Sequence, residues 1–207
     1  MPRVNGGKYM EQNFQFEVLE SQIRECFGRL VWTHTTHQKC IDILEKKEKK
    51  IKVVQIILNT ISAMGLITYI FNNQNWIPPI SAVLTTIALA MDIYCLNYDI
   101  GKEKELHINL VNKLWNIREK YFSLLTDIKI RKLDINEIIS KRDKLQEELN
   151  EAYKTGIRTN SKAYNMATKA LKRNEEMTLH DEEIDMFLPK ELRKSKVLIK
   201  NLPIKKK

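Results

Sequence analysis

The chain has 207 residues and few of the residues that interrupt helices, with five prolines and six glycines. Its three cysteines, Cys26, Cys40 and Cys95, are scattered and odd in number. We therefore expect no disulfide framework of the kind that supports small secreted domains. The stretch before Lys50 has no apolar core of the length that a signal peptide needs, so we also expect no cleaved leader.

One long segment lacks charge altogether. Residues 53–91 contain no Asp, Glu, Lys, Arg or His, in a chain in which 29% of residues are charged. A single helix of that length would overshoot a bilayer core, which about 20 residues span at a rise of about 1.5 Å each. The polar run 72–75 interrupts the segment, Trp76 suits the headgroup level, and Pro78-Pro79 suits the first turn of a new helix. The sequence predicts a transmembrane hairpin over 53–98, with spans 53–71 and 77–96.

Lysines flank both spans and are absent from the turn between them: Lys46, Lys47, Lys49, Lys50 and Lys52 come before, Lys102 and Lys104 after. Because Lys and Arg stay on the cytoplasmic side, we expect a multi-pass membrane protein with both termini cytoplasmic. The net charge of +9 then favours the anionic inner leaflet as its partner. The alternative is a hairpin buried in a soluble protein, but no other long apolar segment is present to cover it.

The expected fold class is all-α: a two-span transmembrane helical hairpin with a cytoplasmic helical bundle. Residues 1–13 are polar, hold Gly6-Gly7 and are predicted to be disordered. From Phe14, apolar and histidine side chains recur at spacings of three and four, which predicts a cytoplasmic amphipathic helix over 14–52 that continues into the first span. Its seam is Ile23, Phe27, Leu30, His34, His37, Ile41 and Leu44.

Beyond the hairpin, the same periodicity predicts cytoplasmic returning helices over 99–155. The first has the seam Leu110, Leu114, Ile117, Tyr121, Leu124 and Ile128. A capping box formed by Asp134 and Glu137 then starts another helix, which ends near Gly156. Residues 156–207 are predicted to hold short helices, capped by Asn160 or Ser161 and near Thr178 to Asp181, and a basic tail that begins at Lys190.

The most chemistry-like cluster is His34, His37 and Cys40. The two histidines lie three residues apart on one helix face and could bind zinc, but Cys40 is turned about 120° away from His34. His107 lies on the returning seam, at a depth expected to match residue 42 and roughly 8–12 Å from the pair. We therefore favour a structural or oligomeric contact, in which the histidines of the seam bond to the returning helix near Trp115 and Arg118. A pH-sensitive contact and a metal site remain the alternatives.

Polar side chains inside the predicted spans form two stripes, Gln55, Asn59 and Ser62 on the first and Ser81, Thr85 and Asp92 on the second. Asn59 and Asp92 are expected at similar depth. An ionisable group such as Asp92 costs about 2.5–3.5 kcal/mol at the centre of a span and usually marks a pathway or a partner. The stripes are candidates for lining a pore, or they bond only to each other. The small residues Ala82, Thr86 and Ala90 form a separate stripe suited to helix packing.

Several separated blocks of the sequence resemble one bacterial family, the SLATT family of SMODS and SLOG-associating two-transmembrane effectors. The resemblance covers residues 20–192, and its blocks are 20–24, 31–40, 55–58, 98–101, 114–119, 123–127, 160–164 and 181–185. It implies a membrane effector of nucleotide-signalled or otherwise triggered conflict systems, thought to form pores or breach the inner membrane during phage attack. Thr35 stands where the family leads us to expect a basic residue.

Two functions follow from these observations. The first is an oligomeric pore or membrane disruptor, silent until a nucleotide-second-messenger system or another trigger protein encoded nearby signals to its bundle. The second is a non-conducting membrane anchor or scaffold that recruits a partner. We expect no enzyme, no cofactor and no catalytic or metal-binding residue, because no nucleophile and base cluster and no phosphate loop appears. A specific nucleic-acid partner is not expected, because the tail lysines lack interleaved aromatics.

Overall fold

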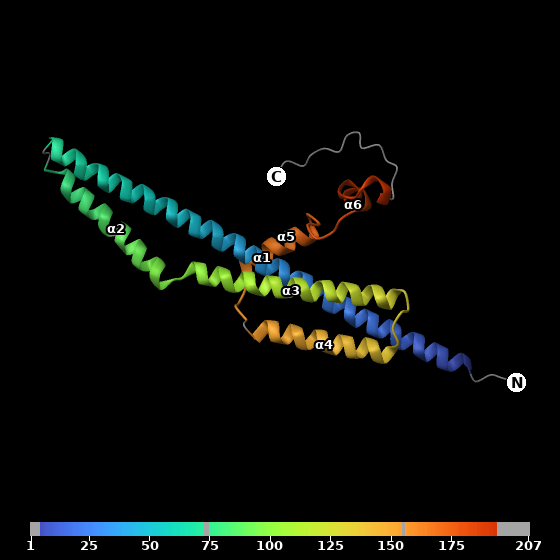
Figure 1. Ribbon diagram of the computed structural model, residues 1–207. Helices are drawn as coiled ribbons and strands as arrows, with labels where there is room; N and C mark the ends of the chain where they lie inside the picture. Colours follow the sequence, from blue (N-terminus) through green and yellow to red (C-terminus); the bar gives the residue numbers. More distant parts are fainter. Residues whose placement is uncertain (1–4, 73–74, 155, 194–207) are drawn as a thin grey trace. The chain divides into compact units, whose positions relative to one another are not determined.

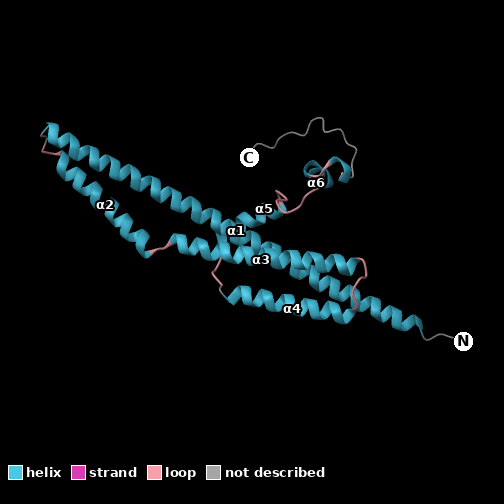
Figure 2. Ribbon diagram, viewed as in Figure 1, coloured by secondary structure: helices cyan, strands magenta, loops and turns pink. Residues whose placement is uncertain are grey.

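The computed structural model describes residues 5–72, 75–154 and 156–193, and over these ranges the chain is helical without a strand (Figures 1 and 2). The elements are α1 (Asn5–Asn72), α2 (Ile77–Asn97), α3 (Ile100–Lys129), α4 (Ile135–Lys154), α5 (Ser161–Lys172), α6 (Asp181–Phe187) and the short 3-10 helix η1 (Lys190–Leu192). The chain divides into two compact units, Met1–Ala167 and Thr168–Lys207. The all-helical prediction is confirmed.

Helix α1 begins at Asn5, so the predicted disorder of residues 1–13 is wrong from that residue on, while residues 1–4 lie outside the described ranges. The two glycines fall in the first turn, where backbone N–H groups have no helical partner in any case. No proline follows before Pro78, so nothing interrupts the helix for its 68 residues. The predicted continuity between the amphipathic segment and the first apolar segment is therefore observed.

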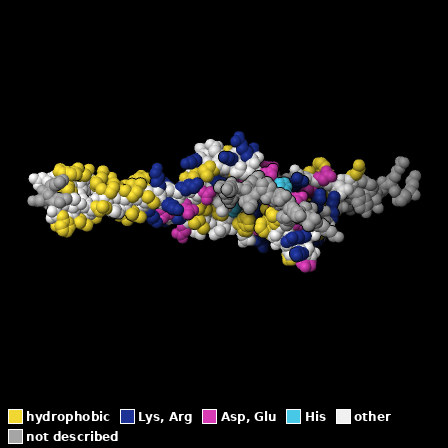
Figure 3. All heavy atoms as spheres, turned by 90° about the horizontal axis from the view of Figure 1, so that it is seen from above, with side chains coloured by type: hydrophobic (Ala, Val, Ile, Leu, Met, Phe, Trp, Pro, Cys, Tyr) yellow, Lys and Arg dark blue, Asp and Glu magenta, His cyan; other side chains and the backbone are white. Residues whose placement is uncertain are grey.

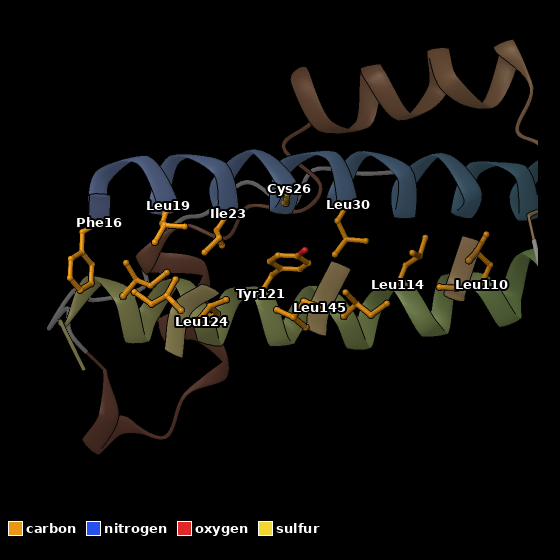
Figure 4. Close-up of a cluster of buried hydrophobic side chains, with 14 residues drawn as sticks. Phe16, Leu19, Ile23, Cys26, Leu30, Leu110, Leu114, Tyr121, Leu124 and Leu145 are labelled. Atoms are coloured by element: carbon orange, nitrogen blue, oxygen red, sulfur yellow. The ribbon is translucent and has the colours of Figure 1, made fainter. Parts of the chain in front are cut away.

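The core of the first unit lies between α1, α3 and α4 (Figure 4). Helices α1 and α3 run side by side, and α4 packs on α3 and less extensively on α1. The predicted seam is buried almost throughout, with Ile23 and Leu30 on α1 and Leu114 and Tyr121 on α3 among the most deeply buried side chains. Helix α4 adds Ile138, Leu145 and Ala152.

Local sequence signals explain how the elements begin and end. The capping box at α4 is present, because Glu137 N donates to Asp134 Oδ1 at 2.8 Å and Asp134 N donates to Glu137 Oε2 at 2.9 Å. Asn160 caps α5, since its Oδ1 accepts from Ala163 N at 2.8 Å. Ala163 and Ala167 of α5 are buried, and Tyr164 packs on Trp32 of α1.

The second unit starts within α5 and contains α6. His180 N donates to Glu183 Oε2 at 3.0 Å at the start of α6, within the predicted start Thr178 to Asp181, and Pro189 follows the end of the helix. The basic tail is described only as far as Arg193, so the prediction for residues 194–207 lies outside the described ranges.

Candidate functional site

The outer surface of the hairpin formed by α1 and α2 is apolar. Large hydrophobic side chains are exposed around both helices: Ile56, Ile57, Ile61, Met64, Ile67, Ile70 and Phe71 on α1, and Ile80, Val83, Ile87, Leu89, Ile93 and Leu96 on α2. Figure 3 shows hydrophobic side chains gathered over the hairpin, whereas Lys, Arg, Asp and Glu side chains appear beyond it, among apolar and other groups. A surface of this extent needs a cover other than water.

By length and composition, one helical stretch among the described residues could cross a membrane, Ile77–Lys129, which includes α2. Only 11% of its apolar window is buried, so the window is not the core helix of the described fold. Among the described residues, α1 is not identified as a second such stretch, so the two-span hairpin remains a prediction.

Polar and small side chains face inward between α1 and α2. Gln55 Nε2 donates to Asp92 Oδ1 at 2.5 Å and lies 4.0 Å from Cys95 Sγ. Ser62 and Ser81 are buried, and the Ser62 hydroxyl has no partner among the described residues. The hairpin is therefore held by a hydrogen bond at its open end and by small side chains further along.

The predicted polar stripes are only partly brought together. Gln55 meets Asp92, one turn earlier on α1 than Asn59, which was expected at a depth similar to that of Asp92. Asn59 and Thr85 are exposed on the outside of the hairpin, where the Thr85 hydroxyl donates to Ser81 O of its own helix at 2.8 Å. Thus Gln55, Ser62, Ser81 and Asp92 lie toward the partner helix or bond to it, while Asn59 and Thr85 point elsewhere.

The predicted packing stripe Ala82, Thr86 and Ala90 is exposed and does not form the contact between α1 and α2. That contact uses Ser81 and Ala88 instead, both buried. Gly65 was not predicted to take part in this contact, but a Cβ added to it would lie 2.3 Å from Ser81 Oγ and 3.7 Å from Ile77 Cγ2. A lone glycine inside an apolar run was the signal that could have indicated this close approach.

Gly65→Leu should therefore push α1 and α2 apart and destabilise the hairpin by about 1–3 kcal/mol, as overpacking does. Gly28→Leu is the matched control, because nothing lies within 4 Å of a Cβ at Gly28 and leucine is the better helix former. Thermal unfolding of both variants in nanodiscs, followed by circular dichroism, measures the difference. Equal stability of the two variants would contradict the close packing at Gly65.

Ion pairs tie α1 to α3 where the bundle meets the hairpin. Glu48 accepts from Lys52 of its own helix and from Lys104 of α3, both at 2.6 Å. The hydrogen bonds from Lys104 and Lys52 lower the pKa of Glu48 to about 2, and the same contact raises the pKa of Lys104. Lys47 lies over the ring of Tyr94 at 6.0 Å, which links α1 to α2 at the same level. We call Glu48, Lys52 and Lys104 the neck.

Two histidines meet next to the neck, and the predicted depth of His107 was wrong. His37 Nδ1 and His107 Nδ1 are 2.8 Å apart, so one neutral ring donates to the other. The predicted depth holds only if every residue between the second span and His107 has the helical rise of about 1.5 Å. Tyr98 and Asp99 are not helical, with ψ values of 83° and 81°, and each advances the chain further than a helical residue does. This displaces α3 away from the hairpin and helps bring His107 to His37.

His34 occupies the predicted seam position and packs against the predicted residues. Its ring lies 5.5 Å from that of Trp115, and the guanidinium of Arg118 lies 4.5 Å from the Trp115 ring. His34 Nδ1 is buried without a hydrogen-bond partner among the described residues. Burial, with the positive charge of Arg118 nearby, lowers the pKa of His34.

The buried histidines His34, His37 and His107 all favour the neutral form. Burial lowers the pKa of His37 to about 4, assisted by His107 and His34, and burial also lowers the pKa of His107 against the opposing effect of Glu103. Cys40 is buried beside Asn160, whose Nδ2 lies 4.0 Å from its Sγ. Among the described residues, no group of three or more His, Cys, Asp or Glu side chains could hold a metal ion.

The described residues define a class of protein: a helical bundle, rich in charge, from which an apolar helical hairpin extends. Within that class, a family model identifies the family of the chain. The model of the SMODS and SLOG-associating 2TM effector domain family 4 (SLATT_4) matches residues 19–183. The chain belongs to this family, which confirms the resemblance of its sequence blocks. Membership implies a membrane effector of conflict and defence systems. Comparisons with curated proteins and with solved structures find no match.

Proposed function

We propose that the chain is a bacterial inner-membrane effector whose α1–α2 hairpin crosses the bilayer twice, with both termini cytoplasmic. The observation that carries the proposal is the distribution of side chains on the hairpin: apolar groups face outward, and a polar and small-residue interface lies between the helices. A soluble protein would bury such a surface, whereas a lipid bilayer covers it.

The lengths of the helices support two spans. Helix α2 has 21 residues, which at about 1.5 Å each matches a hydrocarbon core of about 30 Å. The part of α1 from Val53 to Asn72 has nearly the same length and runs beside α2. Lysines of the neck and its surroundings stand at one end of both segments, and exposed Trp76 stands near the other.

We further propose that triggered chains assemble into an oligomeric pore, because two helices cannot enclose water. Asn59 supports this step: its carboxamide is exposed on the apolar outside of α1 and has no hydrogen-bond partner among the described residues. In a bilayer such a group is satisfied by a neighbouring helix or by water in a pore. Thr86, between Ala82 and Ala90, supplies an exposed small-residue face on which another chain can pack.

The alternative is a non-conducting anchor that recruits a partner through the bundle. In either role we propose that the chain is not an enzyme. A nucleotide-second-messenger system, or another trigger protein encoded nearby, would supply the signal. The two roles differ in whether the assembled chain conducts.

Asp92→Asn tests the pore. The change keeps the side chain's size and its ability to accept from Gln55, but it removes one negative charge per chain near the cytoplasmic mouth. An effect of about 1 kcal/mol on cation entry corresponds to a roughly fivefold loss of cation preference over anions. Ion flux from liposomes that contain the purified chain, with a potassium and a chloride gradient in turn, measures this preference.

Glu105→Gln is the matched control, because it removes one exposed carboxylate from α3 outside the hairpin. We expect wild type and Glu105→Gln to conduct with the same cation preference. If wild type inserts at high density and moves neither ion, the anchor is the correct function. If all three chains conduct alike, Asp92 does not face the pore.

A further inference from the structure

One side of the hairpin ends in lysines and tyrosines at the level of the neck. Lys47 Nζ lies 6.0 Å from the centre of the Tyr94 ring, which joins α1 to α2 on that side. The Tyr94 ring stacks on the ring of Tyr98, with 4.7 Å between their centroids, and both tyrosines are exposed. Lys50 follows Lys47 by three residues and shares its helix face. Two cations and two amphipathic rings therefore form a rim where the proposed membrane has its headgroups.

Beyond this rim the same side of the hairpin is apolar. Seven residues make about two helical turns, so positions counted in sevens from Lys47 along α1, and back from Tyr94 along α2, share the face of the residue they start from. These positions carry exposed apolar side chains: Val54 and Ile61 on α1, and Ile87 and Ile80 on α2. Because α1 and α2 pack along each other, the two rows lie side by side. They form an apolar strip that leads to the rim.

The polar groups of the hairpin lie on another side. At 3.6 residues per turn, Asn59 is turned about 140° from Val54, and Asp92 is turned about 140° from Ile87. A molecule on the apolar strip therefore does not meet the side chains proposed to face a pore.

The two lysines of the rim are not neutralised within the chain. Lys47 and Lys50 are exposed and have no ion-pair partner among the described residues. Three carboxylates near this level are bonded elsewhere: Glu48 accepts from Lys52 and Lys104, Asp92 from Gln55, and Asp99 from the backbone N of Lys102. Figure 3 shows Lys and Arg side chains, in dark blue, next to the end of the apolar surface of the hairpin. An anion at the rim is thus complementary to two ammonium groups.

We propose that this side of the hairpin binds an anionic phospholipid of the cytoplasmic leaflet. The phosphate lies between Lys47 and Lys50, the glycerol region packs on the rings of Tyr94 and Tyr98, and the acyl chains follow the apolar strip. A free phosphate carries the required charge but has nothing to cover the strip, whereas a phospholipid supplies both. The site rests on the proposed transmembrane hairpin, because only an inserted hairpin places the rim at the headgroups. It does not depend on whether the hairpin conducts.

Native mass spectrometry of the full chain, released from nanodiscs, tests the site. The nanodiscs hold equal amounts of anionic phosphatidylglycerol and of phosphatidylcholine, which has no net charge. We expect wild type to retain phosphatidylglycerol in preference. Lys47→Gln combined with Lys50→Gln should weaken that preference by roughly fivefold for each lysine, the contribution of one lysine near an anionic surface. Exchanging chloride for inorganic phosphate at the same ionic strength should leave the retained lipid in place.

Lys49→Gln combined with Lys102→Gln is the matched control. Both lysines are exposed near the same membrane surface, and Lys49 is turned about 160° from Lys47 on α1. The control should retain phosphatidylglycerol as wild type does. An equal loss in both double variants would show only a general attraction to basic residues, and displacement by inorganic phosphate would show an anion site that needs no lipid. Either result would overturn the proposal.

The same experiment separates this proposal from the proposed function. A wild-type chain that enters nanodiscs and retains both lipids alike overturns the lipid site and leaves the transmembrane hairpin standing. A chain that stays out of nanodiscs contradicts both.

Discussion

Acid should loosen the bundle at the histidines beside the neck. Lowering the pH from about 7 to about 5 should lower the unfolding temperature. The reason is that histidines of the unfolded chain bind protons in this range, whereas the buried histidines of the folded bundle stay neutral. Burial holds the pKa of His37 near 4, against 6.5 for a free side chain. Between these two values the unfolded chain binds more protons than the folded one. Stability is therefore complete above about pH 6.5 and is lost as the pH falls toward 4.

The geometry of the pair makes the effect specific. His37 and His107 share one hydrogen bond between their Nδ1 atoms, and doubly protonated rings would have no acceptor there. Arg118 disfavours a further positive charge on His34, whereas Glu103 acts in the opposite direction on His107. We expect a loss of about 2 kcal/mol over the window, which corresponds to roughly 4–8 °C in unfolding temperature.

The double variant His37→Leu with His107→Leu should remove most of this pH dependence. Replacing both partners of a buried hydrogen bond with apolar groups is nearly neutral, so the fold should persist at neutral pH. His180→Leu is the control, since His180 is exposed in the second unit. Thermal unfolding of the three chains across the pH window measures the slopes. A double variant with the wild-type slope would place the titrating group elsewhere.

The sequence was sufficient for features that depend on local periodicity and capping. The seam of α3 from Leu110 to Ile128 is buried as predicted, because apolar spacing of three and four specifies one helix face. The capping box at Asp134 and the cap at Asn160 are likewise local, since each requires only the side chain and the next three residues.

The sequence was insufficient where two helices must be aligned. Two non-helical residues between α2 and α3 shift the register and contribute to the error in the distance predicted between His107 and His37. Asp92 bonds to Gln55, whereas counting residues from the ends of the spans placed it level with Asn59, one turn further along α1. Ala82, Thr86 and Ala90 show a related limit: small size marks a surface on which a helix can pack, but it does not say which helix packs there.

The second large effect concerns topology, on which the proposed function depends. If α1 and α2 cross the membrane, Asn75, exposed at the tip of the hairpin, lies outside the cell. The polar groups and the lysines of the neck then remain on the cytoplasmic side, because moving several charges across a bilayer costs about 2.5–3.5 kcal/mol each on insertion scales. The two ends of the hairpin should therefore differ completely in their access to a reagent that cannot cross the membrane.

The measurement is the labelling of Asn75→Cys by a membrane-impermeant maleimide in intact spheroplasts, with Cys95 replaced by Ser and the buried Cys26 and Cys40 kept. Ser140→Cys, exposed on α4, is the cytoplasmic control. Two spans predict that position 75 labels in intact spheroplasts and that position 140 labels only after lysis. Labelling of position 75 only after lysis would contradict the transmembrane hairpin and, with it, the pore.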